Sequence, residues 1–477
     1  MIRATSTGPS SDVGVSMPER DSFDVIVVGA GLGGLLSALQ FLRRGQRVAV
    51  VERLTHPGGR FTAKTFQGAQ VSTGAVHMLP FGTNGELAAM LRSLDVPHHI
   101  HDAEVFASFH VRSRQYVCRS VLQLAGVLGP RQFGQFIKLG AEMLLGSAAK
   151  ESGQSYRDWL DQRISRQRSP ELYAYFERVC HFALSVDLED VPYPEIVETT
   201  KNMFRYGATG IVDGGCATLT SALEREVKAA GGDLRLLQEV TSITSTGGAV
   251  TGVCLRPREG GVETWLRAPL VISDIGPEAT QRLAEPLIGG TATVAERREA
   301  TGLKVHLLSD YSVIPHRGIM YCLDTQRIAG IVQPSNSDAR LAPPGKHLLI
   351  THQLLRSNDM NVEREAARAD LRYLFGDELG QGVSILTMSQ YRGEWPVNRS
   401  VQGADVRPDT GVSGLYLVGD AVKPSGYLMV EGVAQSVNSL LDRVDTPASA
   451  ATHTPAKPNK RRAFHWLVGP PPPHPGS

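Results

Sequence analysis

The sequence has few cysteines, few aromatic residues and almost no net charge. Its five cysteines (Cys118, Cys180, Cys216, Cys254 and Cys322) are scattered, and no pair has the C-x-x-C spacing. We therefore expect neither a disulfide framework nor a zinc site, and a reducing compartment suits the chain best. The 49 Lys and Arg residues nearly balance the 48 Asp and Glu residues. Because nucleic-acid binding usually needs a basic domain or face, we do not expect a nucleic-acid partner.

Long hydrophobic segments are also scarce. The first residues contain no apolar stretch of the kind that marks a secretory signal. Residues 25–42 carry no charge and approach the length of a membrane span, but four glycines interrupt them. A strand, a glycine turn and a helix explain this stretch better than a span does. We predict a cytoplasmic protein, with peripheral attachment to a membrane as the open alternative.

Glycine and proline are plentiful, and their positions divide the chain. The 477 residues include 49 glycines, which indicates many tight turns and close backbone approaches. Residues 1–22 are polar and contain Gly, Pro and Ser, and residues 446–477 contain eight prolines. We expect both segments to be disordered, which leaves an ordered body of residues 23–445.

Strand and helix patterns alternate through this body. Apolar runs predict parallel strands at 24–28 and 47–52, with a helix over 32–44 between them. Gly45 stands where a helix-ending glycine belongs. The later patterns predict helices over 219–230 and 433–441 and strands at 234–237, 240–244, 250–255, 270–273 and 415–418. This alternation indicates an α/β fold.

Residues 121–146 have a different composition. They are rich in Leu, Ala, Gly and Phe, and their only charges are Arg131, Lys138 and Glu142. Two interpretations are open. The segment forms helices that cover a hydrophobic cavity, or it lies in the plane of a membrane, because an apolar face with sparse cations suits the lipid interface.

A glycine motif follows the first predicted strand. Gly29, Gly31 and Gly34, with Gly33 beside the last, form G-x-G-x-x-G at the start of a helix. The first glycine permits a tight turn, the second lets a pyrophosphate approach the backbone, and the third lets helix and strand pack closely. The helix N-terminus attracts the phosphates. Glu52 ends the next predicted strand, where a ribose-binding acid belongs, so the pattern predicts a dinucleotide site.

Two further segments distinguish between dinucleotides. An acid at position 52 argues against the extra phosphate of NADP. A Gly-Gly-Arg segment lies at 58–60, and a late apolar strand ends in Gly-Asp at 419–420. With the glycine motif, these segments resemble the flavoprotein superfamily of amine oxidases, protoporphyrinogen oxidases and phytoene desaturases. The resemblance implies FAD, bound in a Rossmann-like domain of the glutathione reductase type that is interleaved with an α+β substrate domain.

The resemblance also implies roles for single residues. Gly59 and Arg60 would lie beside the pyrophosphate and flavin, and Gly419 and Asp420 beside the ribityl-phosphate region. Val240 would meet the adenine through its backbone.

The last predicted helix has a role of its own. The resemblance implies that its N-terminus, near Glu431 and Val433, points at the flavin pyrimidine. We expect Glu431 to cap this helix rather than donate a proton. Arg53, next to Glu52, completes the expected cofactor contacts.

The segments at 214–244 and 270–280 resemble the phytoene desaturase and carotenoid isomerase branch most closely. After Asp420, however, the chain reads AVKPSGYLMVEGVAQS, which looks more like the amine oxidase version. From these segments we predict an FAD-binding domain of residues 23–96, 205–300 and 386–445. A substrate domain would comprise residues 97–204 and 301–385.

Three residues are candidates for contact with substrate or flavin. These catalytic candidates are His77, Glu394 and Tyr427, the last as an aromatic residue of the pocket. The plainer alternative is a packed histidine for His77 and a domain-crossing turn for Glu394. Residues 98–102 read His-His-Ile-His-Asp, but alternating side chains of a strand point to opposite faces. We therefore predict a surface strand there and no metal site.

The leading functional hypothesis is an FAD-dependent oxidoreductase that desaturates or isomerises a hydrophobic polyene or isoprenoid, such as a carotenoid precursor, by hydride transfer at flavin N5. No second G-x-G-x-x-G occurs, so electrons would pass to oxygen, a quinone or another protein. A membrane surface is an open further contact. The alternatives are an amine oxidase-type enzyme and a non-catalytic flavin-containing protein that binds a lipid or a partner.

Overall fold

The computed structural model describes residues 21–74, 76–146, 153–284 and 298–445. The two segments that we predicted to be disordered, 1–22 and 446–477, lie outside these ranges apart from residues 21 and 22.

A five-stranded parallel sheet forms the centre of the dinucleotide-binding half, in the order β10-β2-β1-β14-β20. Val25 pairs with Val48 on one side and with Leu270 on the other, which confirms the predicted parallel pairing of the first two strands. All five strands are short. The central strands β1 and β2 are apolar and fully buried, as parallel strands usually are, and β14 and β20 are mostly buried, whereas the edge strand β10 is only partly buried. Their bounds are β1 Val25–Val28, β2 Val48–Val51, β10 Asp233–Arg235, β14 Leu270–Ser273 and β20 Leu415–Leu417.

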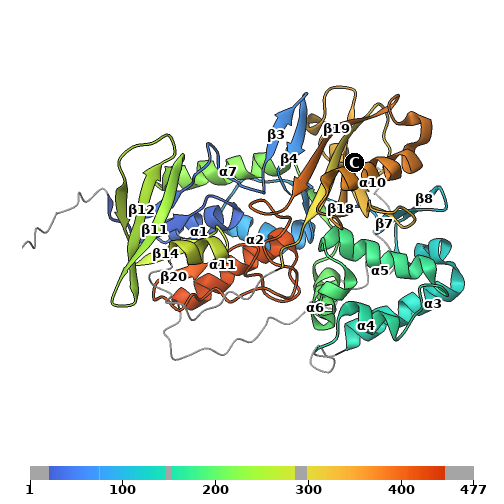
Figure 1. Ribbon diagram of the computed structural model, residues 1–477, viewed down its shortest axis with the longest axis horizontal. Helices are drawn as coiled ribbons and strands as arrows, with labels where there is room; N and C mark the ends of the chain where they lie inside the picture. Colours follow the sequence, from blue (N-terminus) through green and yellow to red (C-terminus); the bar gives the residue numbers. More distant parts are fainter. Residues whose placement is uncertain (1–20, 75, 147–152, 285–297, 446–477) are drawn as a thin grey trace, which may run out of the picture.

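Alternate side chains of this sheet face two different layers. Val25 and Val27 pack against helices, and Ile26 and Val28 pack against a second sheet. The helical layer contains α1 Leu32–Arg43, α2 Glu86–Ser93, α7 Gly215–Ala229 and α11 Met429–Asp445. The opposite layer is the antiparallel sheet of β11 Gln238–Thr246, β12 Ala249–Pro257 and β13 Thr264–Arg267. Figure 1 shows these layers together at one end of the molecule.

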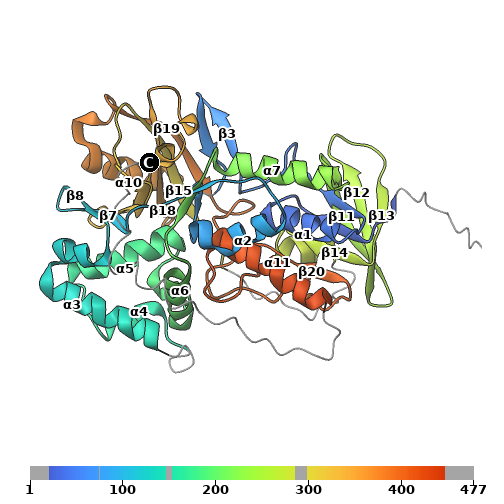
Figure 2. The same ribbon diagram turned by 180° about the vertical axis from the view of Figure 1, so that it is seen from behind.

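The other half is built on a seven-stranded sheet in the order β19-β15-β18-β17-β16-β7-β8. Helix α10 (Met360–Phe375) packs on one face, and α5 (Pro170–Ala183) lies on the other (Figure 2). The strands are β7 Ala107–Val111, β8 Arg114–Cys118, β15 Gly302–Ser309, β16 Met320–Cys322, β17 Gly330–Val332, β18 His347–Leu354 and β19 Val383–Tyr391. Strand β19 crosses the domain boundary that we predicted at residue 386.

Residues 121–146 form a short 3₁₀ turn and helix α3 (Leu124–Leu145). The helix bends at Gly129, whose φ is +74°, followed by Pro130. One face packs against α5 and α6 (Tyr193–Tyr206), beside α4 (Tyr156–Asp161). The opposite face exposes apolar side chains, with Leu145 87% exposed. Within the described ranges, no helix is long and apolar enough to cross a membrane.

Short elements connect the two halves. They are β3 Ala63–Phe66, β4 Ala69–Ser72, β5 Met78–Leu79, β6 Ile100–Asp102, β9 Gly210–Val212 and α8 Pro277–Leu283. The histidine-rich segment 98–102 ends in β6, which pairs with β9. The rings of His99 and His101 meet edge to face, and the described residues contain no group of three side chains placed to hold a metal ion.

Candidate functional site

A cavity of about 820 Å³ lies at the carboxyl ends of the parallel strands. Its wall includes Gly29 after β1, Glu52 after β2, Asp274 after β14 and Gly419 after β20. This edge is where open parallel sheets bind ligands, and the volume suits a cofactor. The cavity therefore unites segments that lie nearly 400 residues apart in the sequence.

The glycine motif forms the first wall of the cavity. Gly29 has a φ of +96°, and its N–H donates to the Val51 carbonyl at 2.8 Å. A Cβ on Gly34 would overlap the Gly29 carbonyl oxygen, so only glycine lets α1 pack this closely on β1. Gly31 and Gly33 face the Asp274 carboxylate, and a Cβ on Gly33 would lie 2.7 Å from it. The turn thus presents backbone and the α1 N-terminus to the cavity, as phosphate binding requires.

Glu52 links the turn after β1 with the turn after β2. Its carboxylate accepts hydrogen bonds from the Ala30 N–H at 2.8 Å and the Leu54 N–H at 2.9 Å. Val240 lines the same end of the cavity. Arg53 is part of the wall as well, but its side chain is 43% exposed and pairs with Glu394 at 3.3 Å. Glu394, 72% exposed, therefore lies at the rim rather than deep in the site.

Arg60 joins the early and late segments of the site. Its guanidinium donates to both carboxylate oxygens of Asp420, at 2.8 and 2.6 Å, and to the carbonyls of Pro396 and Val397. Burial acts to raise the pKa of Asp420, but the charges of Arg60 and Arg399 outweigh it and hold that pKa well below its usual range. Asp420 is therefore ionised, and it fixes Arg60 at the cavity wall.

Asp274 is a site residue that our sequence reasoning missed. Its carboxylate accepts a hydrogen bond from the Gly34 N–H at 2.9 Å. Desolvation in the cavity, together with the charge of Asp420, raises its pKa to about 7, although the Gly34 N–H and the nearby arginines oppose that rise. The sequence signal was its position directly after a buried strand, at the edge where ligands bind.

His77 does not line the cavity, so the structure agrees with the packed histidine that was the alternative to a flavin contact. It is fully buried, with its Nε2 bonded to the Gln70 carbonyl at 3.0 Å and its Nδ1 accepting from the Cys216 N–H at 3.1 Å. Burial and the nearby Lys304 lower its pKa to about 4. Because main-chain groups engage both ring nitrogens, the histidine is neutral and packed.

Glu431 caps a different helix from the one we predicted. Its carboxylate accepts from the Leu87 N–H at 2.9 Å, in the first turn of α2, and from the Phe81 N–H at 3.3 Å. Complete burial raises its pKa to about 7. Val433, from the same helix α11, does line the cavity.

Tyr427 lies outside the described cavity wall, in an aromatic cluster. Its hydroxyl is 3.2 Å from that of Tyr206, and its ring meets Phe81 edge on. The Phe81 and Tyr206 rings stack with centroids 4.8 Å apart. This cluster belongs to the hydrophobic core of the second half of the molecule.

The residues of the cavity fit a flavin dinucleotide. A helix N-terminus and three glycines can receive a pyrophosphate, and Arg60 supplies a cation beside it. Glu52 and Val240 close one end, and apolar side chains including Trp395 and Met429 line the wall elsewhere. FAD has an aromatic ring system at each end and a polar pyrophosphate between them, and this combination of polar and apolar wall suits it.

Comparison with known proteins agrees with this assignment. Residues 32–436 match the sequence profile of the flavin containing amine oxidoreductases. The chain is 30% identical over 421 residues to an uncharacterized protein of Methanocaldococcus jannaschii, covering 88% of this chain and 99% of that one. The crystal structure of an oxidoreductase from Methanosarcina mazei superimposes with a TM-score of 0.80 at 32% identity, over 88% of this chain and all of that one.

Shorter matches reach proteins with named activities. Prolycopene isomerase 2 of an Oncidium hybrid is 33% identical over 94 residues, which cover 20% of this chain and 16% of that one. The phytoene dehydrogenase of Streptomyces griseus is 52% identical over 50 residues, or 10% of each chain. With the profile match across most of the sequence, these findings assign the chain to the flavin containing amine oxidoreductase family, with FAD as its cofactor.

Proposed function

We propose that the protein desaturates or isomerises a hydrophobic polyene or isoprenoid of the carotenoid type. Bound FAD would accept a hydride from the substrate, or exchange one with it. The chain's own residues then have two tasks, which are to hold an apolar carbon chain beside the flavin and to keep water away from it.

The apolar character of the cavity wall near Arg60 supports an uncharged substrate. Trp395, Val397 and Met429 form this part of the wall, and Asp420, an acid of the same wall, is already neutralised by Arg60. A polyene needs no charged partner, whereas an amine cation is usually held by a carboxylate or an aromatic cage.

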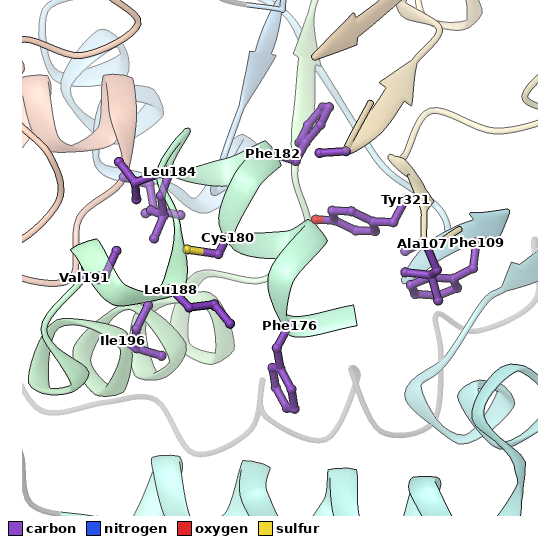
Figure 3. Close-up of a cluster of buried hydrophobic side chains, with 14 of the residues drawn as sticks. Ala107, Phe109, Phe176, Cys180, Phe182, Leu184, Leu188, Val191, Ile196 and Tyr321 are labelled. Carbon is purple, nitrogen blue, oxygen red and sulfur yellow. The ribbon is translucent and has the colours of Figure 1, made fainter. Parts of the chain in front are cut away.

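One observation carries the proposal. Met429 lines the cavity and also packs against the large apolar core of the second half. Figure 3 shows part of this core, where Tyr321 lies between Phe182 of α5 and Phe109 of β7. Met429 therefore connects the wall of the flavin cavity with the apolar core of the predicted substrate domain. The short matches to a prolycopene isomerase and a phytoene dehydrogenase support the same substrate class.

A membrane is the proposed source of such a substrate, and oxygen or a quinone is the proposed electron acceptor. The exposed face of α3 supports the membrane as the source, because Ile137 is 42% exposed and Leu145 is 87% exposed. The same helix exposes the cations Arg131 and Lys138.

Amine oxidation is the second candidate, and two features favour it. The side chains of Phe81, Tyr206 and Tyr427 form an aromatic cluster of the kind that can hold an ammonium group. The sequence after Asp420, which includes Tyr427, also resembles the amine oxidase version.

Anaerobic incubation of the flavin-loaded, full-length protein distinguishes these functions. Phytoene and a poly-cis carotenoid are supplied in detergent micelles, and a panel of amines in buffer. Flavin absorbance and chromatography of the products are recorded together. We expect flavin bleaching and a more unsaturated product from phytoene, or a cis-to-trans product without net bleaching.

The matched control is Gly31→Glu, because a charged side chain at the cradle should exclude the pyrophosphate. Product formed by that variant without flavin would show that the conversion does not depend on FAD. Bleaching by an amine with no conversion of either polyene would overturn the proposal in favour of amine oxidation. Flavin that no compound reduces, together with no product from any of them, would indicate a binding protein.

A further inference from the structure

The carboxylate of Asp274 fills the cradle that the glycine motif forms. This carboxylate accepts a hydrogen bond from the Gly34 N–H, and it also faces Gly31, Gly33 and Gly419. A Cβ on Gly419 would lie 2.6 Å from Asp274 Oδ1. Three glycines from two distant turns thus surround an acid, at the N-terminus of α1.

An acid at this place competes with a phosphate. The N-terminus of a helix attracts anions, and here the anion it meets in the protein is Asp274. The pyrophosphate of FAD brings negative charge to the same cradle. A like charge nearby favours the neutral form of a carboxyl group, and a neutral carboxyl can donate a hydrogen bond to a phosphate oxygen.

The charged groups around Asp274 come from several elements. Asp420, after β20, raises the pKa of Asp274, while Arg60 and Arg399 lower it. The Arg60 guanidinium donates two hydrogen bonds to the Asp420 carboxylate. Glu52 after β2 is held by the Ala30 and Leu54 N–H groups, and Glu278 on α8 lines the same cavity. No histidine, cysteine or lysine is among the described residues of the cavity wall.

We propose that Asp274 is a cofactor-binding residue that meets the FAD pyrophosphate in its protonated form, so that each FAD taken up brings one proton with it. Without FAD, the Asp274 carboxyl is ionised above neutral pH. With FAD bound, the same carboxyl is protonated, and the proton comes from the solvent. This inference needs FAD as the cofactor but no particular substrate, so it stands or falls separately from the polyene proposal.

The sign of the pH dependence follows from that balance. The pKa of Asp274 in the empty protein is already raised to about 7, and the pyrophosphate raises it further. Below that pKa the carboxyl is already protonated, and FAD affinity does not change with pH. Above that pKa, Asp274 must take up a proton when FAD binds, so the dissociation constant of FAD rises by up to about tenfold for each pH unit.

The test uses the full-length chain after removal of its flavin, with rebinding of FAD verified. The dissociation constant of FAD is measured by flavin fluorescence between about pH 6 and about pH 9, where the wild-type value should rise about 100-fold above neutrality. The Asp274→Asn side chain keeps an oxygen that can accept a hydrogen bond from the Gly34 N–H, but it cannot ionise. The FAD affinity of this variant should therefore be independent of pH, and at high pH it should be tighter than that of the wild type. Glu278→Gln removes another acid from the same wall and should keep the wild-type slope.

Calorimetry gives a second readout that needs no variant. The heat of FAD binding in buffers of different ionisation enthalpy yields the number of protons taken up, which should be close to one at about pH 8. Wild-type affinity that is constant over this range, an unchanged slope in Asp274→Asn, or binding without proton uptake would each overturn the inference. Should Asp274→Asn fail to fold, the wild-type proton count decides.

Discussion

Lys304, on β15, is a buried cation whose removal should stabilise the fold. Its side chain is 2% exposed, and Nζ has no hydrogen-bond partner among the described residues. The ammonium lies 4.5 Å from the centroid of the Tyr391 ring. Burial, with a smaller contribution from the charge of Arg60, lowers its pKa from the ordinary 10.5 to about 7, although Cys216 opposes the fall.

This pKa sets both the size and the sign of the effect. Between about pH 7 and pH 10.5 the unfolded chain holds a proton on Lys304 that the folded chain does not. Lys304 therefore destabilises the fold most below neutral pH, and this effect disappears as the pH rises towards 10.5. At 1.36 kcal/mol per pH unit, the pKa difference corresponds to about 5 kcal/mol. Met has a similar length and no charge, so Lys304→Met should stabilise the fold by up to that amount at low pH.

Urea denaturation followed by tryptophan fluorescence measures the free energy of unfolding at about pH 6 and about pH 9, with reversibility verified. Lys346→Met is the matched control, since Lys346 is exposed and pairs with Asp310 at the surface. The control should change stability by less than about 1 kcal/mol. A Lys304→Met variant that is less stable than wild type, or whose gain is the same at both pH values, would refute the reasoning. A buried amine kept against this energetic cost is a candidate for a functional role.

Two further predictions concern the glycine motif and Arg60. Gly34→Ala should lower stability by about 1–3 kcal/mol in the same denaturation assay and reduce flavin content, because its Cβ meets the Gly29 carbonyl; unchanged stability would contradict the packing role of this glycine. Arg60→Ala leaves the buried charge of Asp420 without its partner and should destabilise the fold by about 3–5 kcal/mol, and Asp420→Asn in the same chain should recover part of that loss. A double variant as unstable as the sum of the single ones would show that the pair is not coupled.

The local parts of the fold could be predicted from the sequence. A four-residue apolar run suffices to mark a buried strand, and the predicted strand at 270–273 coincides with β14. Helix boundaries were less accurate. Helix α7 begins at Gly215 rather than residue 219, because the small residues of its first turn carry little apolar signal. The apolar pattern placed the start of the last helix at residue 433, whereas α11 begins at Met429, within the 429–433 segment that the family resemblance implied.

The parts that could not be predicted depend on contacts between distant segments. Asp274 meets Gly34 across 240 residues, and Glu431 meets Leu87 across 344. No local pattern shows that the Asp274 carboxylate will lie among the glycines of the motif, or that Glu431 of α11 will accept a hydrogen bond from the first turn of α2. His77 was a candidate for flavin contact because a glycine segment precedes it, and a packed histidine was the alternative. The Gln70 carbonyl and the Cys216 N–H bind both sides of its ring, which agrees with the alternative.

The flavin content of the purified full-length protein tests the account most directly. Its visible spectrum and the chromatography of the cofactor released on denaturation give the identity and the amount of flavin per chain. The cavity described above predicts one FAD per chain in the wild type and none in Gly31→Glu, with both proteins folded. A colourless wild-type protein that also fails to bind added FAD would contradict the central claim.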